Sequence, residues 1–331
     1  MRIRASVLVL AVACVVAAVA TAAATPKVPK APRGQKVSVL AQHIPTPTAF
    51  AFGNGRVFVA GYGNEDHPAV RGGVYVLGNG KARLLPGSPA HAFGVLFVKD
   101  TLYISAGPQL LAWSGWNGTT FTKRSVALTG PDGFTGFNGL ALGRNGLIYA
   151  GVHNPEEGDA DYAAGTTPYA NDVVTVDPAD GTISVVATGV RQPWMLLFAP
   201  GHSGPLVSDL GQDNLGRTRP PDWVVEAKPG ADFGFPACPA SPAACAGHAK
   251  PFAVFPPHSS PMGLAYLNGK VYVALFDGIG GSGPEVVSMR TRGGATTPFL
   301  TGYPAPIIAL AAYKGVIYSA DQAGTVYSVK P

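Results

Sequence analysis

Charged side chains are scarce in this sequence of 331 residues. Asp, Glu, Lys and Arg make up 13% of the chain, about half of the usual share of roughly 25%. The formal net charge is only +5, and so small and scattered an excess does not form the basic patch that nucleic acids require. Hydrophobic residues nevertheless reach 47%, which excludes disorder for most of the chain.

Long apolar runs are also absent, with one exception at the N-terminus. Arg2 and Arg4 precede an apolar stretch from Ala5 to about Ala20, followed by small residues, which is the pattern of a cleaved export signal. We expect a signal peptide over residues 1–24, a Pro- and Lys-rich linker over 25–36 and one domain over 37–331. No other run approaches the roughly 18 residues that span a bilayer. The mature chain is therefore expected to be secreted or otherwise extracytoplasmic, with no stable membrane insertion.

Cysteine is rare, and only two of the three cysteines lie beyond the leader. These are Cys238 and Cys245, in a proline-rich segment. Export places them in an oxidising compartment, where such a short loop is readily closed by a disulfide. A zinc site with His248 as a third ligand is the alternative, but no second ligand pair has the usual spacing. The sequence favours the disulfide.

Glycine and proline, by contrast, are abundant, with 43 Gly and 31 Pro, and turn formers this frequent exclude a long helical protein. Six segments repeat one pattern of two β runs joined by a tight turn, and a third and a fourth run often follow. The segments begin at Thr48, Phe93, Asn138, Trp194, Met262 and Ile307. Periods of roughly 45 residues with about four strands each are typical of propeller blades. The sequence predicts an all-β, six-bladed β-propeller.

The two ends of the chain support this prediction. The last repeat stops after its third strand, at Gly324 to Lys330, whereas Lys36 to Ala41 looks like an outer strand that precedes the first repeat. Pairing of this N-terminal strand with the C-terminal blade would close the ring and remove an open sheet edge.

In a propeller, the residues before each inner strand and after each second strand meet at one face of the ring. Four of the seven histidines fall at such positions, namely His67, His91, His153 and His258. Each has a structural alternative, because a histidine at a strand entry also caps turns through hydrogen bonds. Arg191 can likewise bind backbone carbonyls or the carboxylates of an anionic cofactor, and Asp209 can simply close a turn.

The chain resembles the glucose/sorbosone dehydrogenases over most of its mature length. The most specific segment is PGADFGFPAC at Pro229 to Cys238, and GVRQPWMLLF, PPHSSPMGLAY and GPEVVSM follow the family pattern in order and at blade spacing. The resemblance implies a secreted six-bladed propeller that uses pyrroloquinoline quinone (PQQ) and Ca²⁺ to oxidise a sugar or polyol.

The resemblance also assigns roles to individual residues. At the position of the family's catalytic histidine this chain has Thr135, and a threonine hydroxyl does not act as a base near neutral pH without a base of its own. His258 or His153 is then the candidate catalytic base. Candidate cofactor contacts are Arg191, His91, Gln212 and Asn138, and candidate metal ligands are Asp209, Gly211 and Asp213.

Two other functions remain open at this point. The missing histidine favours a non-catalytic propeller that binds a carbohydrate or a protein at the cell surface. A metal-dependent lactonase is the third hypothesis, and it requires several Asp, Asn or Glu side chains to converge on one ion in the channel. A sugar or polyol is the expected small molecule both for the carbohydrate-binding propeller and for the quinone-dependent enzyme. The oligomeric state is not specified by the sequence.

Overall fold

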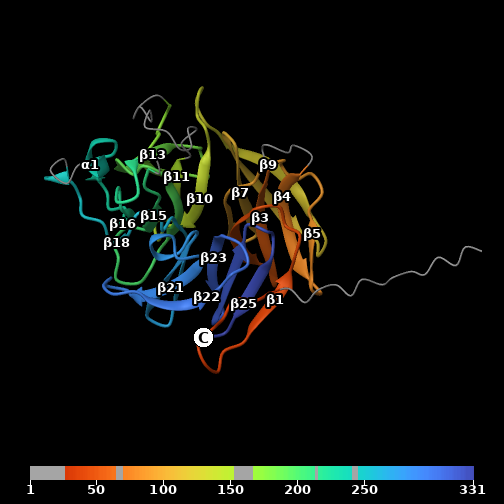
Figure 1. Ribbon diagram of the computed structural model, residues 1–331. Coiled ribbons are helices and arrows are strands. Elements are labelled where there is room, and N and C mark those ends of the chain that lie inside the picture. Colours follow the sequence, from red (N-terminus) through yellow and green to blue (C-terminus); the bar gives the residue numbers. More distant parts are fainter. Residues whose placement is uncertain (1–26, 65–69, 153–166, 213–214, 241–244) are drawn as a thin grey trace, which may run out of the picture.

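Six four-stranded antiparallel blades form the body of the protein, as the repeats predict (Figure 1). The computed structural model describes residues 27–64, 70–152, 167–212, 215–240 and 245–331. The expected signal peptide, residues 1–24, lies outside this described part. Within it, no helix has the length and apolar character of a membrane span.

Each blade runs from an inner strand beside the channel to an outer strand at the rim. Blade 1 consists of β2 (Pro47–Gly53), β3 (Arg56–Gly63), β4 (Arg71–Gly78) and β5 (Lys81–Leu84). Blade 2 consists of β6 (Val95–Val98), β7 (Thr101–Ala106), β8 (Gln109–Trp116) and β9 (Phe121–Thr129). Blade 3 consists of β10 (Phe137–Leu142), β11 (Ile148–Val152), β12 (Val173–Val176) and β13 (Ile183–Thr188).

The second half of the ring repeats this order. Blade 4 consists of β14 (Pro193–Leu197), β15 (Leu206–Asp209), β16 (Asp222–Glu226) and β18 (Ala253–Phe255). Blade 5 consists of β19 (Pro261–Leu267), β20 (Lys270–Leu275), β21 (Glu285–Arg290) and β22 (Thr297–Thr301). Blade 6 consists of β23 (Ile307–Tyr313), β24 (Val316–Asp321), β25 (Val326–Val329) and β1 (Val37–Ala41).

The ring closes as predicted, because β1 pairs antiparallel with β25. Figure 1 shows the two strands side by side, although they come from opposite ends of the chain. The closure hydrogen-bonds both strands and leaves neither terminal blade with three strands.

Two-residue hairpin turns join the inner and second strands in several blades. Asn54 and Gly55 both have positive φ between β2 and β3, at 49° and 69°. A type I′ turn requires positive φ at both central residues, which Asn-Gly provides at little cost. Equivalent turns occur at Asn268-Gly269 and Lys314-Gly315, so the local sequence fixes the register of these hairpins.

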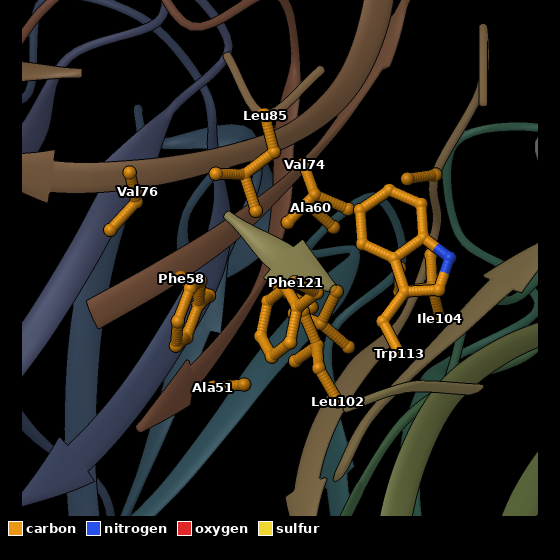
Figure 2. Packing of buried hydrophobic residues seen from close by; sticks show 13 residues of the cluster. Ala51, Phe58, Ala60, Val74, Val76, Leu85, Leu102, Ile104, Trp113 and Phe121 are labelled. Carbon is orange, nitrogen blue, oxygen red and sulfur yellow. The ribbon is translucent and has the colours of Figure 1, made fainter. Parts of the chain in front are cut away.

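The core lies between neighbouring blades rather than in one central cluster. Between blades 1 and 2, Phe58, Leu102 and Ile104 are fully buried, and Phe121 packs against Phe58 with ring centroids 5.5 Å apart. Figure 2 shows these side chains interleaving from both blades, with Trp113 at one edge. Adjacent sheets thus bury apolar faces against each other all around the ring, which holds the inner strands in place.

A long excursion of blade 4 carries the segment most similar to the dehydrogenase pattern. It places β17 (Ala231–Asp232) parallel to β13 of blade 3, and it continues into the short helix α1 (Ala237–Ala240). Cys238 and Cys245 form the expected disulfide, with Cα atoms 4.5 Å apart. His248 Nδ1 lies 3.2 Å from Asp232 Oδ2, and the two cysteines of the alternative zinc site are bonded to each other.

Candidate functional site

Bulges occur at the start of most inner strands, all at one end of the channel, which we call the channel mouth. The register of β2 shifts between Pro47 and Ala49, and similar shifts occur near the start of β10, β14, β19 and β23. A bulge leaves one residue outside the ladder and re-aims its side chain. Thr48, Trp194, Met262 and Ile308 lie within these shifts and line one cavity.

This first mouth cavity has a volume of about 480 Å³ and a largely aromatic wall. The side chains that form the wall belong to five blades: Tyr62, Phe93, Trp194, Met262, Phe276 and Ile308. Phe93 meets Trp194 edge to face, with ring centroids 5.8 Å apart. Polar groups are supplied by Thr46, Thr48, Asn64 and Gln322. No Lys, Arg, Asp or Glu lines the cavity in the described part of the chain.

A second mouth cavity of about 390 Å³ shares Tyr62 and Phe93 with the first. His91, Gln109 and Thr135 contribute its polar groups. The structure thus brings together His91, a cofactor contact expected from the sequence, and Thr135, which the sequence resemblance places at the position of the family's base. Both cavities fall within the size range of small-molecule pockets.

Arg191 lies beside the mouth, and its guanidinium binds backbone. The side chain is 6% exposed, and one terminal nitrogen donates to Leu210 O at 3.1 Å and to Gly211 O at 2.8 Å. These carbonyls belong to the loop that follows β15. These contacts bind one terminal nitrogen of the guanidinium to backbone, as the structural alternative requires, and the contact with an anionic cofactor stays a prediction.

Asp209, at the end of β15, is buried next to this arginine. Its Oδ1 accepts a hydrogen bond of 2.9 Å from the backbone N–H of Gln192. Burial raises the pKa of the Asp209 carboxyl to about 7, although the Gln192 N–H and the charge of Arg191 act in the opposite direction. A carboxyl of this kind is a structural acceptor that is neutral under mildly acidic conditions.

This carboxyl makes stability depend on pH. Its pKa rises from 3.8 in an unfolded reference to about 7 in the fold, so the native state holds the proton more tightly. The stabilisation is complete below pH 3.8 and is lost as pH rises through about 7. The free energy of unfolding should therefore fall by about 1 kcal/mol from pH 6 to pH 8. Urea denaturation at both pH values measures this fall.

Asp209→Asn is the matched variant, since its amide oxygen can still accept from Gln192 N–H while the carboxyl proton is gone. Subtracting its pH slope from that of the native protein isolates the contribution of Asp209 from that of every other titrating group. Equal slopes in the two proteins would contradict the assignment.

The other predicted site residues are placed less favourably for catalysis. His258 Nε2 lies 3.2 Å from the carbonyl oxygen of Gly216, and neither cavity includes this ring. Asn138 is fully buried and donates to Pro193 O at 2.8 Å, while Gln212 is 6% exposed. His67, His153 and Asp213 lie outside the described residues. The catalytic role of the two candidate histidines stays a prediction.

The described residues do not fit the cofactors that the resemblance implies. PQQ carries three carboxylates, which cationic side chains would bind, and none lines either mouth cavity in the described ranges. Calcium takes six to eight oxygen ligands, but Gly211 O already accepts from the Arg191 guanidinium. Among the described residues no three His, Cys, Asp or Glu side chains converge on a point that could hold a metal ion. The metal and cofactor assignments stay predictions without support from this geometry.

Buried polar atoms without a hydrogen-bond partner in the described part of the chain occur next to the mouth. They include the indole Nε1 of Trp194 and the amide Oε1 of Gln192, in residues 7% and 4% exposed. An unsatisfied buried group costs about 1–3 kcal/mol, and such groups in native proteins often mark functional sites. Gln192 directly precedes β14, and Trp194 is the residue of β14 that lines the first mouth cavity.

Sequence reasoning missed the aromatic wall and the buried Asp222. Tyr62, Phe93 and Phe276 look like ordinary core residues in a strand-rich sequence. Their positions could have indicated the channel mouth, because Tyr62 and Phe276 lie at the ends of second strands and Phe93 precedes an inner strand. Asp222 begins a third strand, where no channel position is expected. Its Oδ1 accepts from Gly211 N at 2.7 Å, and its Oδ2 accepts from Ser259 N and Ser260 N at 2.8 and 3.0 Å.

Known structures share this architecture, whereas no protein-family model and no curated protein matches the sequence. A carbohydrate-active enzyme of family AA12 from Trichoderma reesei superposes with a TM-score of 0.74 at 16% identity, over 92% of this chain and 98% of that one. PQQ-bound aldose sugar dehydrogenase from Streptomyces coelicolor gives 0.68 at 17%, over 91% and 99%. The soluble aldose sugar dehydrogenase from Escherichia coli gives 0.70 at 15%, over 90% and 99%. The chain therefore has the six-bladed propeller fold of the soluble sugar dehydrogenases.

Proposed function

We propose that this propeller binds a neutral carbohydrate or a related polyol at the channel mouth, without the quinone chemistry of the sugar dehydrogenases. The observation that carries the proposal is the character of the first mouth cavity, which combines a wall of aromatic side chains with uncharged polar groups. Aromatic rings pack against the C–H faces of sugar rings, while amides and hydroxyls exchange hydrogen bonds with sugar hydroxyls.

Quinone-dependent oxidation needs a cationic group for the cofactor and a base for the substrate. The positions of the candidates for both roles support a propeller that binds a sugar without this chemistry. Arg191 is engaged with Leu210 O and Gly211 O, and the sequence resemblance puts Thr135 at the position of the family's histidine base. His258 contacts a backbone carbonyl and lies outside both cavities. The chain has the fold of a sugar dehydrogenase, and the described residues of the mouth suit the binding of a sugar.

Calorimetric titration of the mature chain with sugars and with PQQ tests the proposal. We expect neutral sugars to bind, with quenching of Trp194 fluorescence, and PQQ not to bind with or without Ca²⁺. Phe276→Ala should weaken sugar binding at least fivefold, because it removes one wall of the first mouth cavity. Phe198→Ala is the matched control, since Phe198 lines a cavity at the opposite end of the same channel.

Micromolar PQQ binding that Arg191→Ala weakens would overturn this proposal and restore the oxidoreductase hypothesis. Absence of binding to any sugar would overturn it as well, and the search would turn to protein partners.

A further inference from the structure

The two mouth cavities share one pair of rings in their walls. Tyr62 and Phe93 belong to the lining of both cavities, and their ring centroids are 4.2 Å apart. Thr48 fixes the backbone at this point, since its hydroxyl donates to Phe93 O at 2.6 Å. A ligand that fills only the first cavity leaves the second cavity unfilled, although Tyr62 and Phe93 line both.

The chemistry of the second cavity differs from that of the first. Its polar groups come from His91, Gln109 and Thr135, whereas Trp194, Met262, Phe276 and Ile308 belong only to the first. The first cavity offers flat apolar surface, and the second offers an amide and an imidazole. Such a division suits a ligand that is held by stacking at one end and by hydrogen bonds at the other.

The imidazole of His91 is oriented by the backbone. Its Nδ1 lies 2.7 Å from the carbonyl oxygen of Tyr62, and a carbonyl only accepts, so Nδ1 carries the hydrogen of this bond. In the neutral ring Nε2 then has no proton and presents a lone pair. Nε2 makes no hydrogen bond with any described residue, and the ring lines the second cavity.

The ring is also held by its neighbour. The His91 and Tyr62 rings pack with centroids 5.0 Å apart, so one residue both accepts from Nδ1 through its backbone and contacts the imidazole through its side chain. A hydrogen-bond acceptor fixed in this way costs little entropy when a ligand binds. A hydroxyl group is the ligand group that an unprotonated imidazole nitrogen selects.

We propose that the second mouth cavity is an additional subsite, and that the mouth takes a ligand of at least two linked polyol rings. One ring lies against the aromatic wall of the first cavity, and a hydroxyl of the next ring donates to His91 Nε2. This inference rests on the proposed function, because it assumes that the first cavity holds a sugar. It assigns to His91 the selection of ligand length, a role distinct from the contact with an anionic cofactor that the sequence suggested.

The test compares glucose with its α-1,4- and β-1,4-linked disaccharides and trisaccharides by calorimetry on the full mature chain. At least one disaccharide should bind at least tenfold more tightly than glucose. His91→Ala should weaken that disaccharide about tenfold and leave glucose within twofold. His91→Gln, whose amide oxygen can accept in place of Nε2, should recover most of the loss, which a merely structural histidine would not show.

Two variants serve as controls, one for loss of the ring at position 91 and one for substitution of a histidine elsewhere. His91→Phe keeps a ring against Tyr62 but has neither the donor to Tyr62 O nor an acceptor, so it should bind like His91→Ala in a protein that still unfolds cooperatively. His43→Asn changes an exposed histidine that lines neither cavity and should bind every sugar as the native protein does.

The possible results separate the two proposals. If glucose and the longer sugars bind equally, or if His91→Ala weakens all of them alike, the subsite is overturned while the sugar-binding function stands. If no saccharide of any length binds, the proposed function itself fails, and this inference fails with it.

Discussion

Asp222→Ala is expected to destabilise the protein more than any other single change near the mouth. The carboxylate is 3% exposed and accepts three backbone hydrogen bonds, from Gly211, Ser259 and Ser260. A hydrogen bond to a charged group contributes about 1.5–3 kcal/mol, and a donor left unsatisfied in the interior adds a desolvation cost. The free energy of unfolding should drop by on the order of 5 kcal/mol, as measured by guanidinium denaturation.

The size of this effect follows from where the three donors come from. Gly211 follows β15 in blade 4, whereas Ser259 and Ser260 lead into β19 of blade 5. The carboxylate therefore joins two blades at the mouth. Asp222→Asn keeps one accepting oxygen but turns an NH₂ group toward backbone donors, so an intermediate loss is expected.

Asp180→Ala is the control for this prediction. Its carboxylate also accepts a backbone hydrogen bond, from Thr182 N at 2.9 Å, but in an exposed turn. Water replaces the lost acceptor there, so the denaturation midpoint should hardly move. A loss at Asp222→Ala as small as that at Asp180→Ala would show that the three hydrogen bonds do not link the blades.

The architecture was predictable because a propeller repeats its signals. Alternating strands and Asn-Gly turns recur along the chain, so each repeat supports the assignment of the others. The additional N-terminal strand complements the last repeat, which has only three strands. The turn at Asn54-Gly55 is encoded by two adjacent residues whose φ values are both positive. Ring closure by β1 required only that Lys36 to Ala41 look like a strand and that the last repeat lack one.

The site was less predictable because the orientation of its side chains depends on hydrogen-bond partners far away in the sequence. Arg191 was expected beside the mouth as a cofactor contact, but the direction of its side chain is set by carbonyls 19 and 20 residues further along the chain. Asp222 depends on backbone donors 37 and 38 residues away. A lone ionisable residue in a sequence does not show whether it faces the channel or the backbone, whereas aromatic residues that look like core can line a cavity.

The role of Arg191 gives the second large prediction. Arg191→Met keeps an apolar stem of similar length but removes both hydrogen bonds to the loop after β15 and the positive charge near Asp209. Removing one partner of a buried charged group typically costs about 3–5 kcal/mol, and we expect a loss of that order in the free energy of unfolding. Guanidinium denaturation measures it.

The same variant separates a structural arginine from a ligand-binding one. Arg191→Lys retains a charge but not the planar fork that reaches two carbonyls, so its stability should fall between those of the native protein and Arg191→Met. Sugar affinity, measured well below the melting temperature of each variant, should stay within twofold, because Arg191 lines neither mouth cavity. If Arg191→Met were as stable as the native protein and lost its ligand, the guanidinium would belong to the binding site, and the cofactor assignment drawn from the family resemblance would regain its main support.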